Sequence, residues 1–443
     1  MTGRDADDLR AGPPLPVKWD HQRLRHRLPG GVTFVAVPLP HLHRATISML
    51  FAAGSRYESP ADNGLAHFTE HMLFRGTERF PTPVELNRAI ENLGGTLEAS
   101  TGPDTTELSV TLPEGMVEAG VEILAEVATR PRFNDIEVER KVVTEELQED
   151  LDEHGASIDV DFLSRSRLWP GQPLGQSVTG PLANVMRFSR EDLERHLGAR
   201  MVAPGTVVCV AGRFAVEPVQ RAVERCFAPM PAAPVPAAPA AARPGRGPSV
   251  LHRHKPGSQT QVRVAFTAFG DEDPDATALA ILERLVDDGM STPLHRRVFE
   301  ERGLAYAVSA GLELYPDTGA YLVDASCVHD NVPDLVAEIL ALLREQRDSP
   351  PAPADIEKAR RRAVWELESI QDSSCAMAAW YGEQALLGRD RNLELEARAL
   401  WTVTAEQVAR AAGRALRGDG LHITTVGVLG AAGRRAVARL AAG

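Results

Sequence analysis

The sequence predicts an α+β fold built from two duplicated halves, each an α/β sandwich. Three observations support this prediction. Short stretches with strand-like alternation are interleaved with longer ones in which apolar residues recur every three or four positions. The order of helix, glycine, two strands and helix occurs twice, about 208 residues apart, as from Gly95 to Gly303. A segment rich in proline and alanine separates the two occurrences.

The chain length also favours two domains. The 443 residues exceed what one hydrophobic core usually serves, and 43% of them are hydrophobic, as in ordinary globular proteins. Residues 229–249 contain many prolines and alanines and almost no large apolar side chains, which predicts an extended, semi-rigid linker. We therefore expect an N-terminal domain at 1–228 and a C-terminal domain at 250–443.

The elements of the first half follow from local patterns. Strands are assigned to alternating stretches, and helices to stretches with one continuous apolar face that end at a glycine or proline. In order, we expect strands at 32–37 and 45–51, helices at 64–75 and 84–93, strands at 96–101 and 107–112, and helices at 114–129, 134–152 and 158–168.

The second half repeats this plan. It opens with a strand and a helix, and a short helix then ends at a glycine before two alternating stretches. In order, we expect a strand at 261–266, helices at 275–287 and 294–301, strands at 305–314 and 320–327, and helices at 332–347 and 355–369.

Charge and cysteine content exclude several kinds of partner and location. The 61 acidic residues outnumber the 48 basic ones, and the formal charge of −13 argues against nucleic acid or an anionic membrane as a partner. The four cysteines are scattered without CxxC pairing, which fits a reducing compartment. Residues 1–16 lack the apolar run of a signal peptide, and no stretch is long and apolar enough to span a membrane. We expect a cytoplasmic protein.

The segment GLAHFTEHMLF carries the chemistry. On a helix, His67 and His71 lie one turn apart and can present both rings to one ion, with Glu70 on the same face. Two imidazoles suit zinc, and a neighbouring carboxylate can accept a proton from water. The spacing is HxxEH, the reverse of the HExxH zinc motif. The alternative is two solvated histidines beside a surface acid, but the motif lies in an apolar helix that follows a glycine.

A third ligand should come from the helix expected at 134–152. Glu139 and Glu146 are seven residues apart, which is two helical turns, so both can face one side. An acid-rich helix is also a common solvated surface. Spacing alone does not select Glu146 over Glu145 or Glu149.

At this point the sequence resembles the insulinase/pitrilysin family of zinc metallopeptidases, particularly the smaller subunits akin to mitochondrial processing peptidase. The segment GLAHFTEHMLFRGTERFPT resembles the family signature G-x-x-H-F-x-E-H-M-x-F-x-G-T. The segments PLGQSVTGPLANVMRFSREDLERHL, VVCVAGRF and RGLAYAVSA are also similar to family segments. The resemblance extends from about residue 25 to about residue 430.

The resemblance implies a zinc endopeptidase with one Zn²⁺ per chain. It implies that Glu146 is the third ligand beside His67 and His71, that Glu139 supports the site, and that Glu70 is the general base. It also implies a clamshell of four related domains, of which this chain supplies two, so a complete chamber requires a dimer. A peptide substrate would lie inside as an added strand near residues 96–101.

One departure from the family pattern concerns the second half. Tyr306 matches a family tyrosine that contacts substrate, but the arginine expected seven residues earlier is Phe299. In paired members of the family, one subunit holds zinc and the other supplies the Arg/Tyr pair. We therefore expect a heterodimer with a homologous subunit. A homodimer with a weakened site, a metal-binding module without turnover and a non-catalytic chamber subunit are the alternatives.

Overall fold

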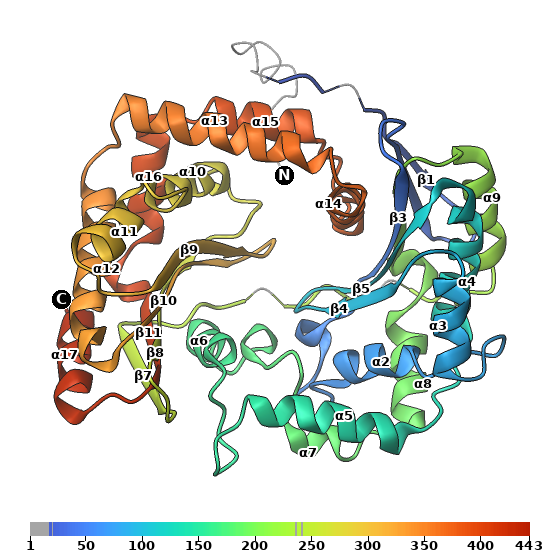
Figure 1. Ribbon diagram of the computed structural model, residues 1–443, viewed down its shortest axis with the longest axis horizontal. Helices are drawn as coiled ribbons and strands as arrows, with labels where there is room; N and C mark the ends of the chain where they lie inside the picture. Colours follow the sequence, from blue (N-terminus) through green and yellow to red (C-terminus); the bar gives the residue numbers. More distant parts are fainter. Residues whose placement is uncertain (1–16, 20, 235–236, 241) are drawn as a thin grey trace.

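The computed structural model describes residues 17–19, 21–234, 237–240 and 242–443 (Figure 1). The expectation that residues 1–16 carry no signal segment lies outside the described residues. Among the described residues, no helix is both long enough and apolar enough to cross a membrane.

The first half is organised around a six-stranded sheet with the strand order β1-β2-β6-β3-β5-β4. Neighbouring strands are antiparallel except β2 and β6, which are parallel. The strands are β1 (Leu24–Arg27), β2 (Thr33–Pro38), β3 (Arg44–Phe51), β4 (Leu97–Thr101), β5 (Thr106–Pro113) and β6 (Thr206–Gly212). Strand β4 therefore forms one edge of this sheet.

The second half contains a five-stranded sheet with the order β7-β11-β8-β10-β9. The strands are β7 (Ser249–His254), β8 (Thr260–Ala268), β9 (Ala307–Leu314), β10 (Gly319–Cys327) and β11 (Leu421–Gly427). Only β7 and β11 are parallel, so order and direction reproduce those of the first sheet without β1. This correspondence confirms the predicted α+β fold with a duplicated unit.

One face of each sheet is covered by helices from the same half of the chain. Figure 1 shows α3, α4 and α9 outside the first sheet and α12 and α17 outside the second. The helices on the first sheet are α3 (Pro83–Glu91), α4 (Val117–Thr129) and α9 (Val216–Phe227). Those packed together on the second are α10 (Ala276–Val286), α12 (Val332–Asp348), α16 (Ala405–Ala415) and α17 (Ala431–Ala441).

The opposite face of each sheet is covered by the other half of the chain. Helix α14 (Ser374–Leu386) packs on β2, β3 and β6, and α6 (Val160–Leu168) packs on β8 and β11. Both faces of β2 are therefore buried. Phe34 and Ala36 enter the core beneath α4 and α9, whereas Val35 and Val37 pack against Met377 on α14. The division of the chain into domains at residues 228 and 250 stays a prediction, because each part supplies a helix that covers the sheet of the other part.

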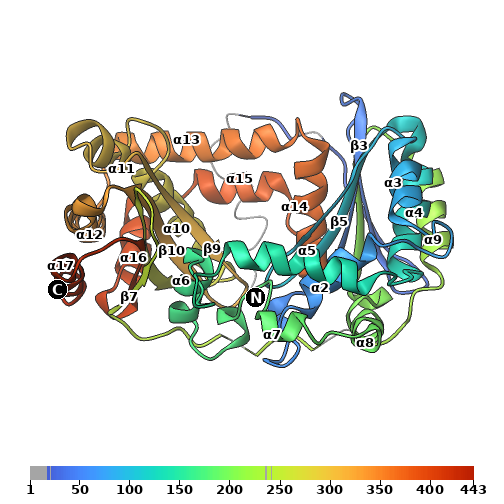
Figure 2. The same cartoon turned by 60° about the horizontal axis from the view of Figure 1, so that its bottom comes forward.

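Helices α13 (Pro353–Ile370) and α15 (Leu393–Trp401) connect α14 to the second half. Figures 1 and 2 show them side by side along one border of the molecule, with α14 at their end beside the first sheet. The chain thus crosses to the first sheet and returns to the second.

Polar contacts also join the two halves near the turn between β9 and β10. Arg56, which is 5% exposed, lies 2.5 Å from a carboxylate oxygen of Asp317, and the same carboxylate accepts a hydrogen bond from the backbone N–H of Ala242. Trp169 donates its indole N–H to Thr318 at 3.1 Å. The described parts of segment 229–249 contain no helix, and strand begins only at its last residue.

The expected elements are found with small shifts at their ends. One differs in kind: the helix expected at 294–301 is a short α11 (Pro293–His295) continued by a π-helical segment (Arg296–Glu301). Single π-turns of this kind insert one residue per turn and rotate the following side chains. Several elements have no counterpart among the expected ones: strands β1, β6, β7 and β11, and helices α7 (Leu182–Val185), α8 (Arg190–Arg200), α9 and α14 to α17.

Candidate active site

The helix that carries the HxxEH motif, α2 (Leu65–Leu73), begins at a tightly packed turn. Gly64 precedes it with a φ of +97°, and a Cβ there would lie 2.6 Å from the carbonyl oxygen of Thr179. Only glycine fits, because this backbone is left-handed and leaves no room. The buried Glu58 carboxylate accepts the backbone N–H groups of Gly64 at 2.8 Å and Ala66 at 2.6 Å. These donors have no partner within the helix.

Burial of one face of α2 sets the direction of the motif. Leu65, Phe68 and Met72 are at most 2% exposed and pack into the first core. Since residues three and four apart share a face, His67 and His71 are placed together on another one. That face is turned toward helix α5 (Ile136–Glu149).

Helix α5 presents its acidic residues to α2 for the same reason. Val143 and Leu147 are buried, which anchors one stripe of α5 in the core. Glu139 and Glu146 both reach the motif histidines. The two-turn spacing seen in the sequence therefore corresponds to one face of a real helix.

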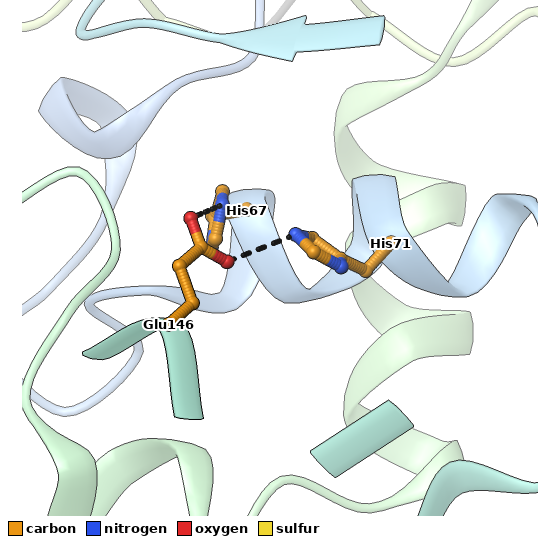
Figure 3. Close-up of side chains that lie close together, drawn as sticks. All are labelled: His67, His71 and Glu146. Atoms are coloured by element: carbon orange, nitrogen blue, oxygen red, sulfur yellow. Dashed lines mark ion pairs between the residues drawn. The ribbon is translucent and has the colours of Figure 1, made fainter. Parts of the chain in front are cut away.

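Two imidazoles and one carboxylate converge between the helices (Figure 3). His67 Nε2 lies 3.5 Å from Glu146 Oε1, and His71 Nε2 lies 3.4 Å from Glu146 Oε2. The two rings are 4.7 Å apart between centroids. Within the described part of the chain, only these three residues form a group of His, Cys, Asp or Glu with ligand atoms within 4.8 Å of one another.

The other ring nitrogen of His71 is held by Glu139. Its Nδ1 lies 2.9 Å from Glu139 Oε1, so the carboxylate accepts the Nδ1 proton, and Nε2 is the ring nitrogen that faces Glu146. Arg75 Nη1 lies 3.5 Å from the second Glu139 oxygen. Glu139 therefore fixes the orientation and tautomer of the imidazole, with Arg75 balancing its charge.

The charges of this group shift the protonation of its members. Burial alone would lower the pKa of His71, but hydrogen bonds with Glu139 and Glu146 outweigh burial and raise this pKa to about 9. His67 and His71 together hold the pKa of the Glu146 carboxyl well below its usual range. The acids thus make this position strongly attractive to positive charge.

Glu70 does not join this group but lies beside it on α2. The hydroxyl of Thr101, the last residue of edge strand β4, donates a hydrogen bond to Glu70 Oε2 at 2.6 Å. The carboxylate is thereby held between the helix and the sheet edge. Glu70 is placed as an unligated acid next to the three-residue group.

The three-residue group fits a zinc ion in chemistry and spacing. Two nitrogen or oxygen ligands each about 2.1 Å from a tetrahedral ion are about 3.4 Å apart. The His67–Glu146 and His71–Glu146 separations of 3.5 Å and 3.4 Å match this value. Two imidazoles and one carboxylate are also the donor set of catalytic zinc sites, which keep a fourth position open.

The residues expected from the second half lie apart from this group. Tyr306 precedes β9, its side chain is 80% exposed, and no hydrogen bond links it to the site among the described residues. Phe299 is 41% exposed on the π-helical segment. The arginines near Phe299 are engaged elsewhere, since Arg297 and Arg302 both form ion pairs with Glu338 on α12.

Three residues that bear on the site had not been expected from the sequence. They are Glu58 at the start of α2, Arg75 beside Glu139, and Thr101 beside Glu70. No spacing rule connects the strand residue Thr101 with a helix residue 31 positions earlier. Glu58 lies outside any helix or strand, so no periodicity indicates where its side chain points. Of the three, only Arg75 follows the motif closely enough to invite attention.

Family models match most of the chain. The model for the insulinase peptidases (family M16) matches residues 34–182, and the model for the inactive domain of M16 peptidases matches residues 187–363. Similar proteins include an uncharacterized zinc protease of Mycobacterium tuberculosis, which is 30% identical over 87% of this chain and 88% of its own length. The chain therefore belongs to peptidase family M16, the insulinase family, as the resemblance indicated.

Three further similar proteins extend the comparison. A probable β subunit of the mitochondrial-processing peptidase of Arabidopsis thaliana is 27% identical over 95% of this chain and 82% of its own length. A protease from Helicobacter pylori has the same fold, with a TM-score of 0.86 and 19% identity over 93% of this chain and all of that chain. A structure of an M16 inactive domain from Pseudomonas fluorescens matches with a TM-score of 0.81. It is 19% identical, and the match covers 92% of this chain and 98% of that chain.

Proposed function

We propose that this chain is a zinc-dependent endopeptidase of the HxxEH type. The observation that carries the proposal is the convergence of His67, His71 and Glu146 on one position with ligand separations suited to zinc. The names of its relatives as zinc proteases support the same activity. Zinc would be held once per chain.

Each residue of the site has a distinct part in peptide hydrolysis. Zinc, when bound by these three ligands, supplies a Lewis acid that activates water and polarises the scissile carbonyl. Glu70 accepts a proton from the attacking water and then donates it to the nitrogen of the leaving amine. Glu139 keeps the His71 imidazole oriented and in the tautomer that can act as a ligand.

The second half is proposed to contact substrate without holding metal. Exposed Tyr306 is available to a bound peptide, and in the first half edge strand β4 offers unpaired backbone groups to an added strand.

Because Phe299 stands where the family has arginine, we propose a dimer, preferably with a homologous subunit that supplies an Arg/Tyr pair. The four unpaired cysteines support a cytoplasmic location.

A second candidate is a non-catalytic subunit that binds peptides within such a dimer. The Phe299 departure and the ion-paired arginines around it favour this alternative, since no guanidinium of the described residues is free there to contact substrate. The intact set of His67, Glu70, His71 and Glu146 argues for catalysis. The two candidates differ in whether the assembled protein cleaves peptide.

The test is peptide cleavage by the wild type and by Glu70→Gln, with zinc content measured for both. Cleavage of a quenched fluorescent peptide is followed for the chain alone and for the chain assembled with a homologous subunit. We expect Glu70→Gln to keep its zinc and to lose about 10²- to 10⁴-fold in kcat, the usual contribution of a general base. Chelation should abolish wild-type cleavage, and zinc should restore it.

The outcomes separate the candidates. Wild-type turnover in Glu70→Gln would remove Glu70 as the base. Stoichiometric zinc without cleavage in either assembly would favour the peptide-binding subunit. Cleavage by the chain alone would remove the need for a second subunit.

A further inference from the structure

The Glu70 side chain is tied to the edge of the first sheet by a single side chain. Thr101 Oγ1 lies 2.6 Å from Glu70 Oε2. An ionised carboxylate only accepts, so the threonine hydroxyl is the donor. Hydrogen bonds of a hydroxyl to a carboxylate at this distance are among the stronger ones in proteins.

The surroundings leave the Thr101 hydroxyl proton no better acceptor. Its cross-strand neighbour Thr106 donates its own hydroxyl proton to the carbonyl oxygen of Ala53 at 2.9 Å. The Thr106 oxygen is 3.5 Å from Thr101 Oγ1, which is long for a hydrogen bond between hydroxyls. The Thr101 proton therefore points to Glu70.

The strand geometry fixes where this hydroxyl is presented. Alternate residues of a strand face the same side, so Thr101 shares its side with buried Leu97, toward α2. Ser100, the adjacent residue, is exposed on the opposite side. Because β4 is an edge strand, its backbone is the part of the first sheet open to pairing with an added strand.

We propose that Thr101 is a positioning residue that holds Oε2 of Glu70 and leaves Oε1 as the oxygen that exchanges the proton. The inference rests on the proposed function of Glu70 as general base. It adds a link between the base and the edge strand of the first sheet.

Three single variants test the positioning role. Thr101→Val keeps the shape and removes the donor, and Thr101→Ser keeps the donor. The control Thr129→Val makes the same change at the end of α4, where the threonine hydroxyl donates to the carbonyl oxygen of Ala125. For Thr101→Val we expect kcat to fall about 10- to 100-fold, the range seen when a supporting hydrogen bond is lost. KM should stay within about twofold, because substrate binding does not use this bond. Zinc content should be unchanged.

Rescue separates positioning from a general structural effect. Thr101→Ser should regain most of the wild-type kcat, and Thr129→Val should cleave at the wild-type rate. A fall in kcat that Ser does not rescue, or a rise in KM with unchanged kcat, would overturn the proposal.

A double-variant cycle with Glu70→Gln separates this inference from the proposed function. Thr101→Val should cost nothing further in kcat in the Glu70→Gln background, because the group it positions is gone. If Glu70→Gln is inactive while Thr101→Val is fully active, only the inference fails. If Glu70→Gln is fully active, or if the wild type does not cleave peptide, both fail. A second cycle with Glu70→Ala, which removes the acceptor, should give non-additive unfolding midpoints and so tests the contact without turnover.

Discussion

At the scale of single residues, the site depends on buried polar groups with specific partners. Glu58 shows this best, because both of its oxygens accept backbone N–H groups at the start of α2. Burial nevertheless raises the pKa of Glu58 to about 7, against the opposing hydrogen bonds from Ala66 and Gly64. A carboxyl that resists ionisation when buried is retained here because the helix start needs acceptors.

A buried histidine beside this helix makes stability depend on pH. His196 on α8 (Arg190–Arg200), which packs on α2, is 7% exposed. Burial, with a smaller effect of Arg200, lowers the pKa of His196 to about 4. The unfolded chain, with a pKa near 6.5, binds the proton more tightly. The contribution of neutral His196 to stability is therefore complete above pH 6.5 and is lost as pH falls toward 4.

We expect His196→Leu to remove this part of the acid sensitivity. Between pH 7.5 and pH 5, the wild type should lose about 2 kcal/mol more unfolding free energy than the variant. Urea unfolding at the two pH values measures the difference. The control is His154→Leu, at a side chain that is 81% exposed, which should leave the pH dependence unchanged. Equal losses in wild type and His196→Leu would contradict the assignment.

At the scale of elements, the exchange of α6 and α14 between the halves is the main structural device. Each helix fills the face that the other half leaves open, and the strands beneath are buried on both sides. Close approach of α14 depends on Gly382, where a Cβ would lie 2.4 Å from Leu50 Cδ1 and 3.3 Å from Cys209 Cβ. A helix can pack this closely only where a small residue faces the sheet.

We expect Gly382→Val to lower stability by about 1–3 kcal/mol, because the added side chain overpacks this contact. Gly413 on α16 is the matched control: it is also helical, but a Cβ there meets nothing within 4 Å. Gly413→Ala should raise stability by about 0.5–1 kcal/mol through its helix propensity. Thermal unfolding measures both variants, and a stabilised Gly382→Val would contradict the packing argument.

At the scale of the whole molecule, the two halves are joined by more than the segment that connects them. Exchanged helices, the ion pair of buried Arg56 with Asp317 and the Trp169–Thr318 hydrogen bond all cross between them. The position of the half that carries His67, His71 and Glu146 relative to Tyr306 is therefore set by packing rather than by a flexible tether.

We expect residues 1–228 and 250–443, produced separately, to fold poorly on their own. Without α14, the first part would expose Val35, Val37 and Cys209, and without α6 the second would expose the opposite face of its sheet. Co-production should yield a 1:1 complex with a cooperative unfolding transition. Size-exclusion chromatography and dye binding to apolar surface measure this. Two monodisperse, independently folding parts would contradict the argument.

Much of the site could be predicted from sequence because its key relations are local. The spacings His67–His71 and Glu139–Glu146 follow helical periodicity, which depends only on neighbouring residues. The duplicated α+β plan was visible in alternation and helical periodicity for the same reason. The packing of α14 on β2, β3 and β6 could not be predicted in this way, because it joins residues far apart in the chain and no local pattern selects that sheet.

The sequence by itself determined the two helical motifs, the duplicated element order and, through resemblance, the family. The resemblance implied Glu146, and the tertiary structure brings this residue, rather than Glu145 or Glu149, to the two histidines. It alone brought Thr101 to Glu70, Glu58 to the start of α2, and each half's helix to the other half's sheet. The reason is physical: no helical or strand periodicity connects these residues, most of which are distant along the chain, and the burial of apolar faces on several elements at once selects the contacts.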